Sequence, residues 1–439
     1  MRRASCSWRT PGGMDSAPPP THSSACLPRS RSPLSRTAVM STAELDLLVR
    51  TRRDLHRHPE LGFQEHRTAG IIAERLRAAG YEVRTGVAET GVVGTLRGGA
   101  GAGPTLLLRA DMDALPIAEE CTHDFTSTHP GRMHACGHDA HVAIGLAVAE
   151  RLARARGEWG GEVRYVFQPA EESGQGARRM VEEGVLEGVD AALGLHVWLG
   201  MESGVVGVVP GPFMASSGEF EITVRGRGGH GAMPHQTVDA VLAASQVVVA
   251  LQSIVSRNTS PLDAAVVSVG IFQAGTAHNV IADSARLVGT VRAFDVDACA
   301  ELPRRIERVA AGVCQALGAE YAFRYEQDTP PTINDPAMAE HVRAAAEDVV
   351  GAKRVRTDPD VRTMASEDFG EFLLRVPGCY FFVGARNEAS GAVHPHHSPR
   401  FDLCEDSLPV AVEVLERAAR RVLNGRGTGN GERGKCEQA

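Results

Sequence analysis

The chain has 439 residues, a formal net charge of −8 at pH 7 and a pI near 6.1, which leaves room for two or more domains with buried cores. The acidic balance and the lack of a basic run argue against a protein that binds nucleic acid. No run of 18 or more apolar residues occurs, which argues against a membrane-spanning helix, and the nine scattered cysteines favour reduced thiols in a cytoplasmic protein.

The two ends of the chain differ from its middle. Residues 1–40 are rich in Ser, Pro and Arg, contain Asp15 as their single acidic residue, and lack the apolar core of a secretory signal. We expect a disordered leader there, or a translation start at Met40; an organelle transit peptide is an alternative that the prolines disfavour. Residues 425–439 are Gly-rich and charged and are expected to form a disordered tail.

Between these ends, residues 41–211 and 327–424 are predicted to form the two parts of one α/β domain. Short apolar runs alternate with helical patterns, which is typical of a mainly parallel sheet covered on both faces. The expected helices are residues 42–56, 66–79, 139–155, 176–183, 336–350 and 405–423, and the expected strands are 91–96, 105–110, 163–168, 191–195 and 379–383.

Residues 212–326 are predicted to be an inserted α+β domain. Their elements follow a β-α-β-β-α-β order, which commonly makes a four-stranded sheet with two helices on one face, as in ferredoxin-like folds. A Gly-rich turn at 227–231 interrupts this order after the first strand. The expected strands are residues 219–225, 264–272, 285–293 and 320–325, and the expected helices are 237–255 and 298–317.

Several metal-competent side chains follow the predicted strands of the α/β domain. In the motif 134–139, Cys136 and His138 flank Gly137, which lets the backbone fold back so that both side chains can converge on one ion. Ligands of such sheets gather beyond the carboxyl ends of the strands. The other candidates there are Asp111, Asp113, Glu171, Glu172 and His196, and three histidines (His394, His396 and His397) lie near the last strand. The pattern favours a metal centre.

The sequence also resembles a known family. The motifs HRHPELGF (56–63), RADMDALP (109–116), HACGHD (134–139), QPAEE (168–172), GLH (194–196) and GGHGA (228–232) are similar to those of M20 metallopeptidases. The similarity runs from about residue 42 to residue 422 and is greatest to the amidohydrolase branch. That branch includes hippurate hydrolases, N-acyl-amino-acid amidohydrolases and plant auxin-conjugate hydrolases.

The resemblance implies one or two divalent ions, Mn²⁺ or Zn²⁺, with Ni²⁺ or Co²⁺ as further possibilities. Most of the superfamily has a histidine where this chain has Asp111, so His138 is expected to supply that imidazole. A thiolate ligand favours zinc or another late transition metal, whereas oxygen ligands favour manganese. The implied ligands are Cys136, His138, Glu172, His196 and His397, with His394 and His396 as loop neighbours that can lie behind the ligands.

The same resemblance assigns roles around the metal. Glu171 is the expected general base, and because adjacent strand residues point to opposite faces, Glu171 and Glu172 should lie in a turn. Asp113 is expected to orient a metal ligand. In the inserted domain, His230 is expected to stabilise the oxyanion, with the possibility that it comes from a partner subunit. Asn279 and Arg292 are expected to bind the substrate carboxylate.

The sequence therefore predicts a metal-dependent hydrolase of small N-acyl-amino acids that releases a carboxylic acid and a free amino acid. The resemblance further implies a homodimer formed through the inserted lid domain. One alternative is a dipeptidase or aminopeptidase of the same superfamily. Another is a catalytically silent protein that binds metal or peptide, and a zinc-dependent regulatory module is disfavoured because the ligands are spread over about 260 positions.

Overall fold

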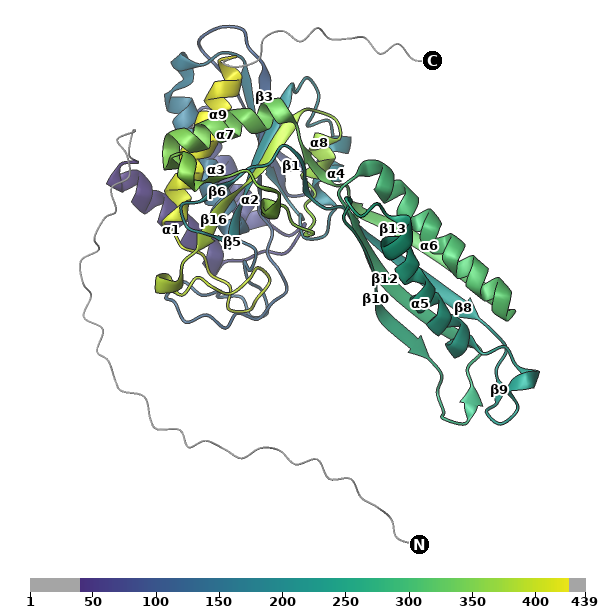
Figure 1. Ribbon diagram of the computed structural model, residues 1–439. Helices are drawn as coiled ribbons and strands as arrows, with labels where there is room; N and C mark the ends of the chain where they lie inside the picture. The colour runs from purple at the N-terminus through teal and green to yellow at the C-terminus, as the bar shows by residue number, and fades with distance from the viewer. Residues whose placement is uncertain (1–39, 426–439) are drawn as a thin grey trace, which may run out of the picture. The chain divides into compact units, whose positions relative to one another are not determined.

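The computed structural model describes residues 40–425. The predicted leader (1–40) and tail (425–439) fall outside this range except for Met40 and Gly425, so their structure stays a prediction. The described residues contain a large sheet built from both ends of the chain and a second, four-stranded sheet built from the middle (Figure 1).

The large sheet has eight strands, and its four central strands are parallel. The antiparallel pair β1–β2 continues the sheet beyond β4, and β6 and β15 continue it beyond β16. The predicted mainly parallel sheet is thus present at its centre. In order across the sheet, the strands are β1 (Glu82–Val87), β2 (Gly91–Arg97), β4 (Glu162–Gln168), β3 (Thr105–Asp111), β5 (Ala191–Glu202), β16 (Gly378–Arg386), β6 (Val206–Gly207) and β15 (Val355–Arg356).

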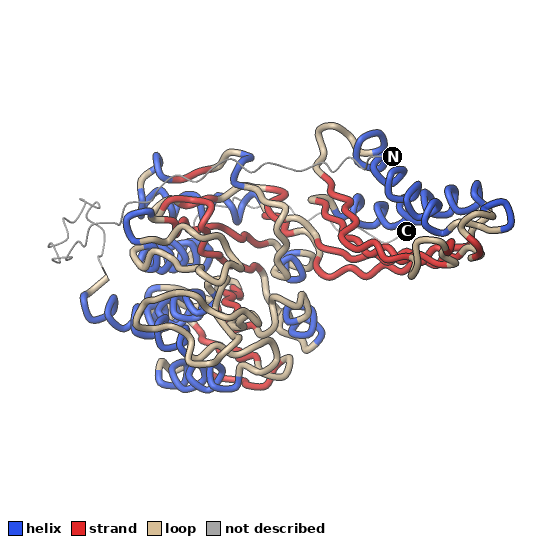
Figure 2. Tube along the Cα trace, turned by 90° about the horizontal axis from the view of Figure 1, so that it is seen from below, coloured by secondary structure: helices blue, strands red, loops and turns tan. Residues whose placement is uncertain are grey.

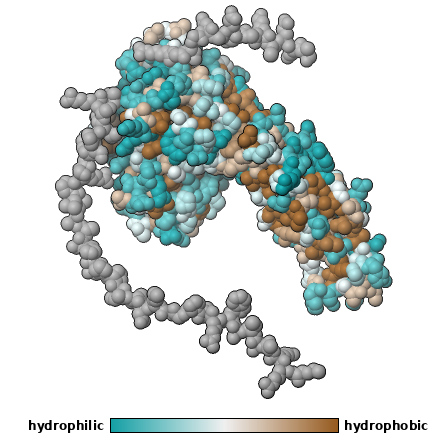
Figure 3. All heavy atoms as spheres, viewed as in Figure 1, coloured by the Kyte–Doolittle hydropathy of each residue, from teal (hydrophilic) through white to brown (hydrophobic). Residues whose placement is uncertain are grey.

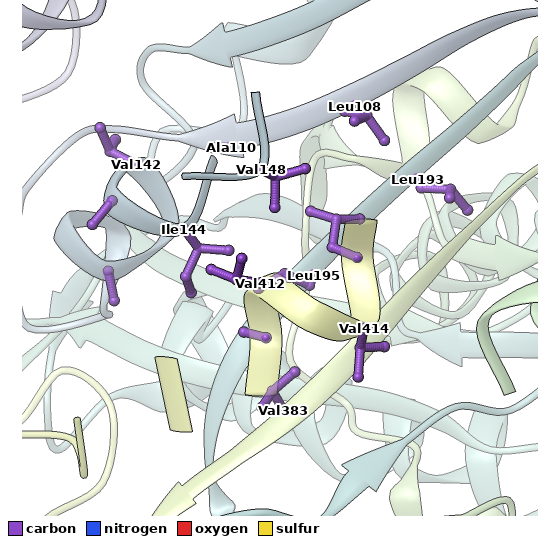
Figure 4. Close-up of a cluster of buried hydrophobic side chains, with 14 of the residues drawn as sticks. Leu108, Ala110, Val142, Ile144, Val148, Leu193, Leu195, Val383, Val412 and Val414 are labelled. Carbon is purple, nitrogen blue, oxygen red and sulfur yellow. The ribbon is translucent and has the colours of Figure 1, made fainter. Parts of the chain in front are cut away.

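Hydrophobic side chains cover both faces of this sheet. Along β3, Leu106 and Leu108 join one buried cluster, whereas Leu107 joins the cluster on the opposite face. Figure 4 shows the first cluster, in which Ile144 and Val412 from two helices lie near the strands. Five helices contribute to this cluster: α1 (Thr42–Arg57), α2 (His66–Ala78), α3 (His138–Arg154), α7 (Pro336–Val350) and α9 (Ser407–Leu423). The opposite face packs against α4 (Gly176–Glu182) and α8 (Gly370–Leu373).

Local sequence signals explain where these helices begin. Ser41 and Glu44 form a capping box before α1, in which each side chain bonds the backbone of the other. Asp335 caps α7 through its carboxylate, and Pro336 occupies the first helical position, where a missing N–H costs little. Strand β1 escaped prediction because its side chains are mostly exposed and carry no apolar run.

The inserted domain has the predicted β-α-β-β-α-β order. Its antiparallel sheet has the order β10-β12-β8-β13, and Figure 2 shows two helices forming a layer beside it. The strands begin at Ser217, five residues after the predicted start of the domain at 212, because Gly211–Met214 (β7) pairs with β14 (Thr332–Asn334) instead. The elements are β8 (Ser217–Arg225), α5 (Ala240–Asn258), β10 (Ala265–Ala274), β12 (Ser284–Ala293), α6 (Val296–Leu317) and β13 (Glu320–Thr329).

Helix α5 is, by length and composition alone, apolar enough to cross a membrane. Its inner face packs against the inserted domain's own sheet through residues such as Val247 and Leu251. Its outer face leaves Val249 66% exposed and Leu242 50% exposed. Hydrophobic side chains gather over the inserted domain in Figure 3, a feature that bears on assembly.

Candidate metal centre

Two of the expected ligands lie at the start of helix α3. Gly137 is the N-cap of that helix and has a φ of +96°, in the left-handed region that only glycine adopts without strain. A side chain at this position would also meet Val197, because an added Cβ would lie 2.6 Å from its Cγ2 atom. The expected turn between Cys136 and His138 is therefore present, and it depends on glycine.

His138 is buried and oriented by Asp113. Its Nδ1 atom lies 3.0 Å from the Asp113 carbonyl oxygen and 3.2 Å from a carboxylate oxygen of the same residue, so Nδ1–H donates to Asp113. The Nε2 atom then faces three carboxylates, at 3.7 Å from Asp111, 3.9 Å from Glu171 and 4.0 Å from Glu172. This is the arrangement of a metal-binding histidine with a carboxylate behind it.

Glu171 and Glu172 lie in a turn directly after β4, as expected. The turn is set by Ala170, whose φ of +51° is unusual for a residue with a side chain. The buried Glu65 carboxylate accepts a hydrogen bond of 2.9 Å from the Ala170 N–H and one of 2.6 Å from Thr90. These contacts hold the strained turn in place and thereby direct both carboxylates to the same side.

Cys136 completes a second group of donors. Its Sγ atom lies 3.4 Å from Nε2 of His196, whose Nδ1–H donates to the Val197 carbonyl oxygen at 2.6 Å. One donor atom each of Cys136, Glu172 and His397 also lie within 4.8 Å of one another. Cys136 and Glu172 are thus shared between neighbouring groups of donors.

The C-terminal histidines make different contacts, and both His396 and His397 have a donor atom close to Cys136. His397 has a φ of +65°, and its Nε2 atom lies 3.3 Å from Glu172. His396 instead accepts a hydrogen bond at Nε2 from the Leu199 N–H at 3.1 Å, so its Nδ1–H faces Cys136 at 3.9 Å. His396 therefore lies behind the thiol, stacked on Trp198, while His394 belongs to none of these contacts among the described residues.

The sequence prediction placed His196 at the end of a strand ending at 195. This was wrong in detail, because β5 continues to Glu202 and His196 lies in its middle, paired with Phe382 of β16. The apolar pattern continues after His196 through Val197, Trp198 and Leu199, so the histidine interrupts the pattern without ending the strand.

The electrostatics of the site reflect crowded acidic groups. Burial, Glu367 and Glu172 together raise the pKa of Glu171 well above its usual value. Burial, Glu172 and Glu171 likewise raise the pKa of the Cys136 thiol. Burial opposes protonation of His138, but Asp111 and Asp113 outweigh it and raise the pKa of His138 to about 10. Such an excess of negative potential favours positive charge at the centre of the group.

Among the expected metal ligands, two buried atoms have no hydrogen-bond partner within the described residues, namely Nε2 of His138 and Oε1 of Glu172. Buried polar atoms normally have partners, and both of these lie among the other donors. Imidazole, thiolate and carboxylate atoms so placed fit one or two divalent cations. The residues that would hold these cations are Cys136, His138, Glu172, His196 and His397, the same ligands that the sequence motifs implied.

The donors open onto a cavity of about 520 Å³. Glu171, Glu172 and His397 form part of its wall, and Trp198 and Met214 give it an apolar side. Ser217, Arg292, Asp328 and Thr329 of the inserted domain complete it. Asp113 does not line the cavity, which agrees with its contacts behind His138 and Glu172.

The other two predicted residues of the inserted domain lie elsewhere. His230 and Asn279 adjoin each other where β9 (Gly229–His230) pairs with β11 (Val280–Ile281), and neither is among the described residues that line the cavity. This two-stranded sheet lies beyond the Ser284 end of β12, whereas Arg292 lies at the other end of β12, roughly 25 Å along the strand. Asn279 and Arg292 of one chain therefore do not bind one carboxylate together, contrary to the expectation.

Sequence reasoning missed a buried network beneath the site. The Arg109 guanidinium donates to Gln168, Asp111, Glu367 and Asp368 at 2.6–2.9 Å, and Glu367 in turn accepts from Tyr380. Glu367 and Asp368 follow no apolar run, so no signal in the sequence indicated that they lie near the site. His141 was detectable, since it lies three residues after His138 on α3, and its Nδ1 atom lies 2.5 Å from Asp111.

Comparisons with known proteins agree with this geometry. Residues 107–421 match the model of peptidase family M20/M25/M40. Thermostable carboxypeptidase 1 of Saccharolobus solfataricus is 39% identical over 367 residues, covering 83% of this chain and 92% of that protein. N-acetyl-L-cysteine deacetylase of Bacillus subtilis is 38% identical over 385 residues, covering 88% and 90%.

A solved structure is similar over nearly the whole described chain. The Bacillus subtilis YXEP protein, described as a dinuclear metal-binding peptidase of the M20 family, is 36% identical and superimposes with a TM-score of 0.77. The match covers 87% of this chain and 99% of that one. The similarity extends over both sheets, so it includes the inserted domain.

Proposed function

The chain belongs to peptidase family M20/M25/M40, a family of metal-dependent hydrolases of amide bonds, and from this premise we propose that it hydrolyses N-acyl-α-amino acids. The products are a carboxylic acid and a free amino acid. The observation that carries this proposal is that Glu171, the Arg292 guanidinium and four of the five expected metal ligands (Cys136, Glu172, His196 and His397) line one cavity. Such a cavity can bind an acylated amino acid by its carboxylate while the amide faces the metal-binding residues.

The reaction needs water as a nucleophile and a proton for the leaving amine. Bound divalent cations supply the Lewis acidity that makes water nucleophilic near neutral pH. Glu171 lines the cavity beside the expected metal ligands, and we propose that it takes the proton from the attacking water. It then passes the proton to the amine nitrogen as the amide bond breaks.

Arg292 is the proposed contact for the substrate carboxylate. It is half-buried at the cavity wall, and its guanidinium donates to Thr290 and to the Val291 carbonyl oxygen, which leaves donors for a ligand. A planar guanidinium can bind a carboxylate through two parallel hydrogen bonds. Substrates with a free α-carboxylate are therefore expected to bind better than simple amides.

We propose that the active enzyme is a homodimer formed through the inserted domain. Strand β10 is an edge strand with Ile271 and Phe272 each more than two-fifths exposed, and the outer face of α5 is apolar. An edge strand and an apolar helix side by side favour pairing with a second copy. This arrangement would let His230 and Asn279 of one chain reach the cavity of its partner.

The dimer can be tested by mixing two inactive variants, His230→Ala and Glu171→Gln. In a mixed dimer one site has an intact Glu171 and receives an intact His230 from the partner. After full exchange, half of the dimers are mixed and one site in each works, so about a quarter of the wild-type activity should return. No recovery in samples shown to have exchanged subunits would rule out the shared site.

Zinc is the proposed native metal, with manganese as the second candidate, because a thiolate ligand favours late transition metals. We also propose a cytoplasmic location, since the six cysteines within residues 40–425 are all free thiols. A panel of N-acetyl and N-benzoyl amino acids, dipeptides and N-acyl amines tests the substrate class. Cleavage of dipeptides alone would favour the peptidase alternative, and zinc binding without any cleavage would favour a silent relative.

A further inference from the structure

A second group of metal-competent side chains lies outside the cavity. It consists of His56 at the end of α1, with Glu119 and His123 from the segment between β3 and α3, and is here called the His56 cluster. We propose that the His56 cluster binds a divalent transition-metal ion of the zinc type, separate from the ions of the catalytic centre.

The distances in the cluster are those of ligands around one ion. Oε1 of Glu119 lies 3.3 Å from Nε2 of His56 and 3.3 Å from Nε2 of His123, and one donor atom of each residue lies within 4.8 Å of the others. Zinc bonds of about 2.0–2.2 Å in a tetrahedron place ligand atoms roughly 3.3–3.5 Å apart. Two imidazoles and one carboxylate leave a fourth position for water.

Two of the three donor residues, His56 and Glu119, are oriented by a contact on their far side. Nδ1 of His56 lies 2.8 Å from Asp139, whose carboxylate is held at 2.8 Å by the Arg52 guanidinium. Nδ1–H of His56 therefore donates to Asp139, and Nε2 keeps its lone pair for an ion. The other oxygen of Glu119 accepts the Ser127 N–H at 2.6 Å, which leaves Oε1 for the same ion.

The unpartnered atoms distinguish a metal site from a plain ionic cluster. A protonated His56 between two carboxylates would explain the contacts of His56 by itself. It would not explain His123, because neither of its buried ring nitrogens has a hydrogen-bond partner among residues 40–425. The same holds for His134, which is 2% exposed and whose ring centre lies 6.4 Å from that of His56. An ion bound to His123 removes the cost of one such orphaned group.

The expected role of the ion is structural. None of the three residues lines the cavity, so the ion would not touch a substrate there. It would instead fasten α1 to the segment that ends in Cys136 and His138. The consequence is that zinc should raise the thermal stability of the chain even when the catalytic centre cannot bind metal.

The test uses the full chain without Cys136 and Glu172, the two ligands shared between the donor groups of the catalytic centre, as the double variant Cys136→Ala/Glu172→Ala. Metal-stripped protein is incubated with Zn²⁺, desalted and analysed for zinc by mass spectrometry. We expect about one zinc per chain to remain, and X-ray absorption to show nitrogen and oxygen ligands at about 2.0–2.2 Å. Adding His123→Ala should remove this zinc and abolish the zinc-dependent rise in melting temperature.

His129→Ala is the matched control, because His129 is an exposed histidine of the same segment and should leave the zinc in place. Glu119→Gln serves as a second test variant, since its amide oxygen can still accept the Ser127 N–H but ligates zinc poorly. Circular dichroism checks that each variant is folded. The proposal is overturned if the double variant retains no zinc, or if its zinc survives both His123→Ala and Glu119→Gln.

Discussion

Removal of Arg109 should cost much of the stability of the fold. Its guanidinium is fully buried and forms ion pairs with Asp111, Glu367 and Asp368 at 2.6–2.9 Å. Arg109→Met keeps much of the side-chain volume but leaves three carboxylates without their shared cation. Breaking one buried ion pair by removing one partner costs about 3–5 kcal/mol, whereas a folded domain has about 5–15 kcal/mol in total.

Three pairs do not cost three times as much, because the carboxylates can take up protons. Burial already raises the pKa of Asp368 to about 8, so this group needs little compensation near neutral pH. We therefore expect a loss of about 3–5 kcal/mol for Arg109→Met near neutral pH. A raised carboxyl pKa in the folded state means that folding binds protons, so the loss should shrink as the pH falls and grow as it rises.

The assay is urea denaturation followed by circular dichroism at several pH values. Arg375→Met is the matched control: Arg375 is 44% exposed, pairs with Glu371 one helical turn away, and should lose less than about 1 kcal/mol. The reasoning is refuted if Arg109→Met is no more destabilised than Arg375→Met, or if its loss does not depend on pH.

Three further predictions concern the metal centre and the substrate. Gly137→Ala forces a side chain into a left-handed conformation against Val197, so it should lower the free energy of unfolding by about 1–3 kcal/mol and weaken zinc binding. Thermal-shift and metal-content assays measure the two effects. The control Gly157→Ala, which has open space around it, should show neither effect. Arg292→Met removes a charged hydrogen bond and should lower kcat/KM roughly 10- to 150-fold for N-acyl-amino acids but not for N-acyl amines, and an equal loss for both would contradict the carboxylate contact. Removal of metal by a chelator should abolish hydrolysis and lower the melting temperature, and Zn²⁺ or Mn²⁺ should restore both. An unchanged melting temperature would mean that no bound ion stabilises the metal-binding residues.

The sequence predicted most of the fold because the apolar patterns were long and regular. The order of elements in the inserted domain, the turn at Gly137 and the position of Glu171 and Glu172 beyond β4 were all predicted. Each depends on local chemistry, such as the periodicity of buried residues or the freedom of glycine. Strand β1 and the short strands were missed because neighbouring strands, and not their own sequence, stabilise them.

The site residues that belong to a sequence motif could be predicted, whereas those whose position depends on tertiary contacts could not. The donor set converges as the motifs implied, with His397 facing Glu172 and His396 behind the thiol. Asn279 and Arg292 were expected together, yet the length of β12 separates them within one chain. The buried carboxylates of Glu367 and Glu65 could not be predicted, because their partners lie far away in the sequence.

The most direct test of the proposed function is hydrolysis of N-acyl-amino acids by metal-stripped protein before and after Zn²⁺ or Mn²⁺ is returned, with Glu171→Gln alongside. The stripped protein should be inactive, the wild type should recover, and the variant should bind metal but release no amino acid. Full activity without metal would contradict the account, as would comparable recovery in Glu171→Gln, because either result would show that the hydrolysis does not depend on this centre.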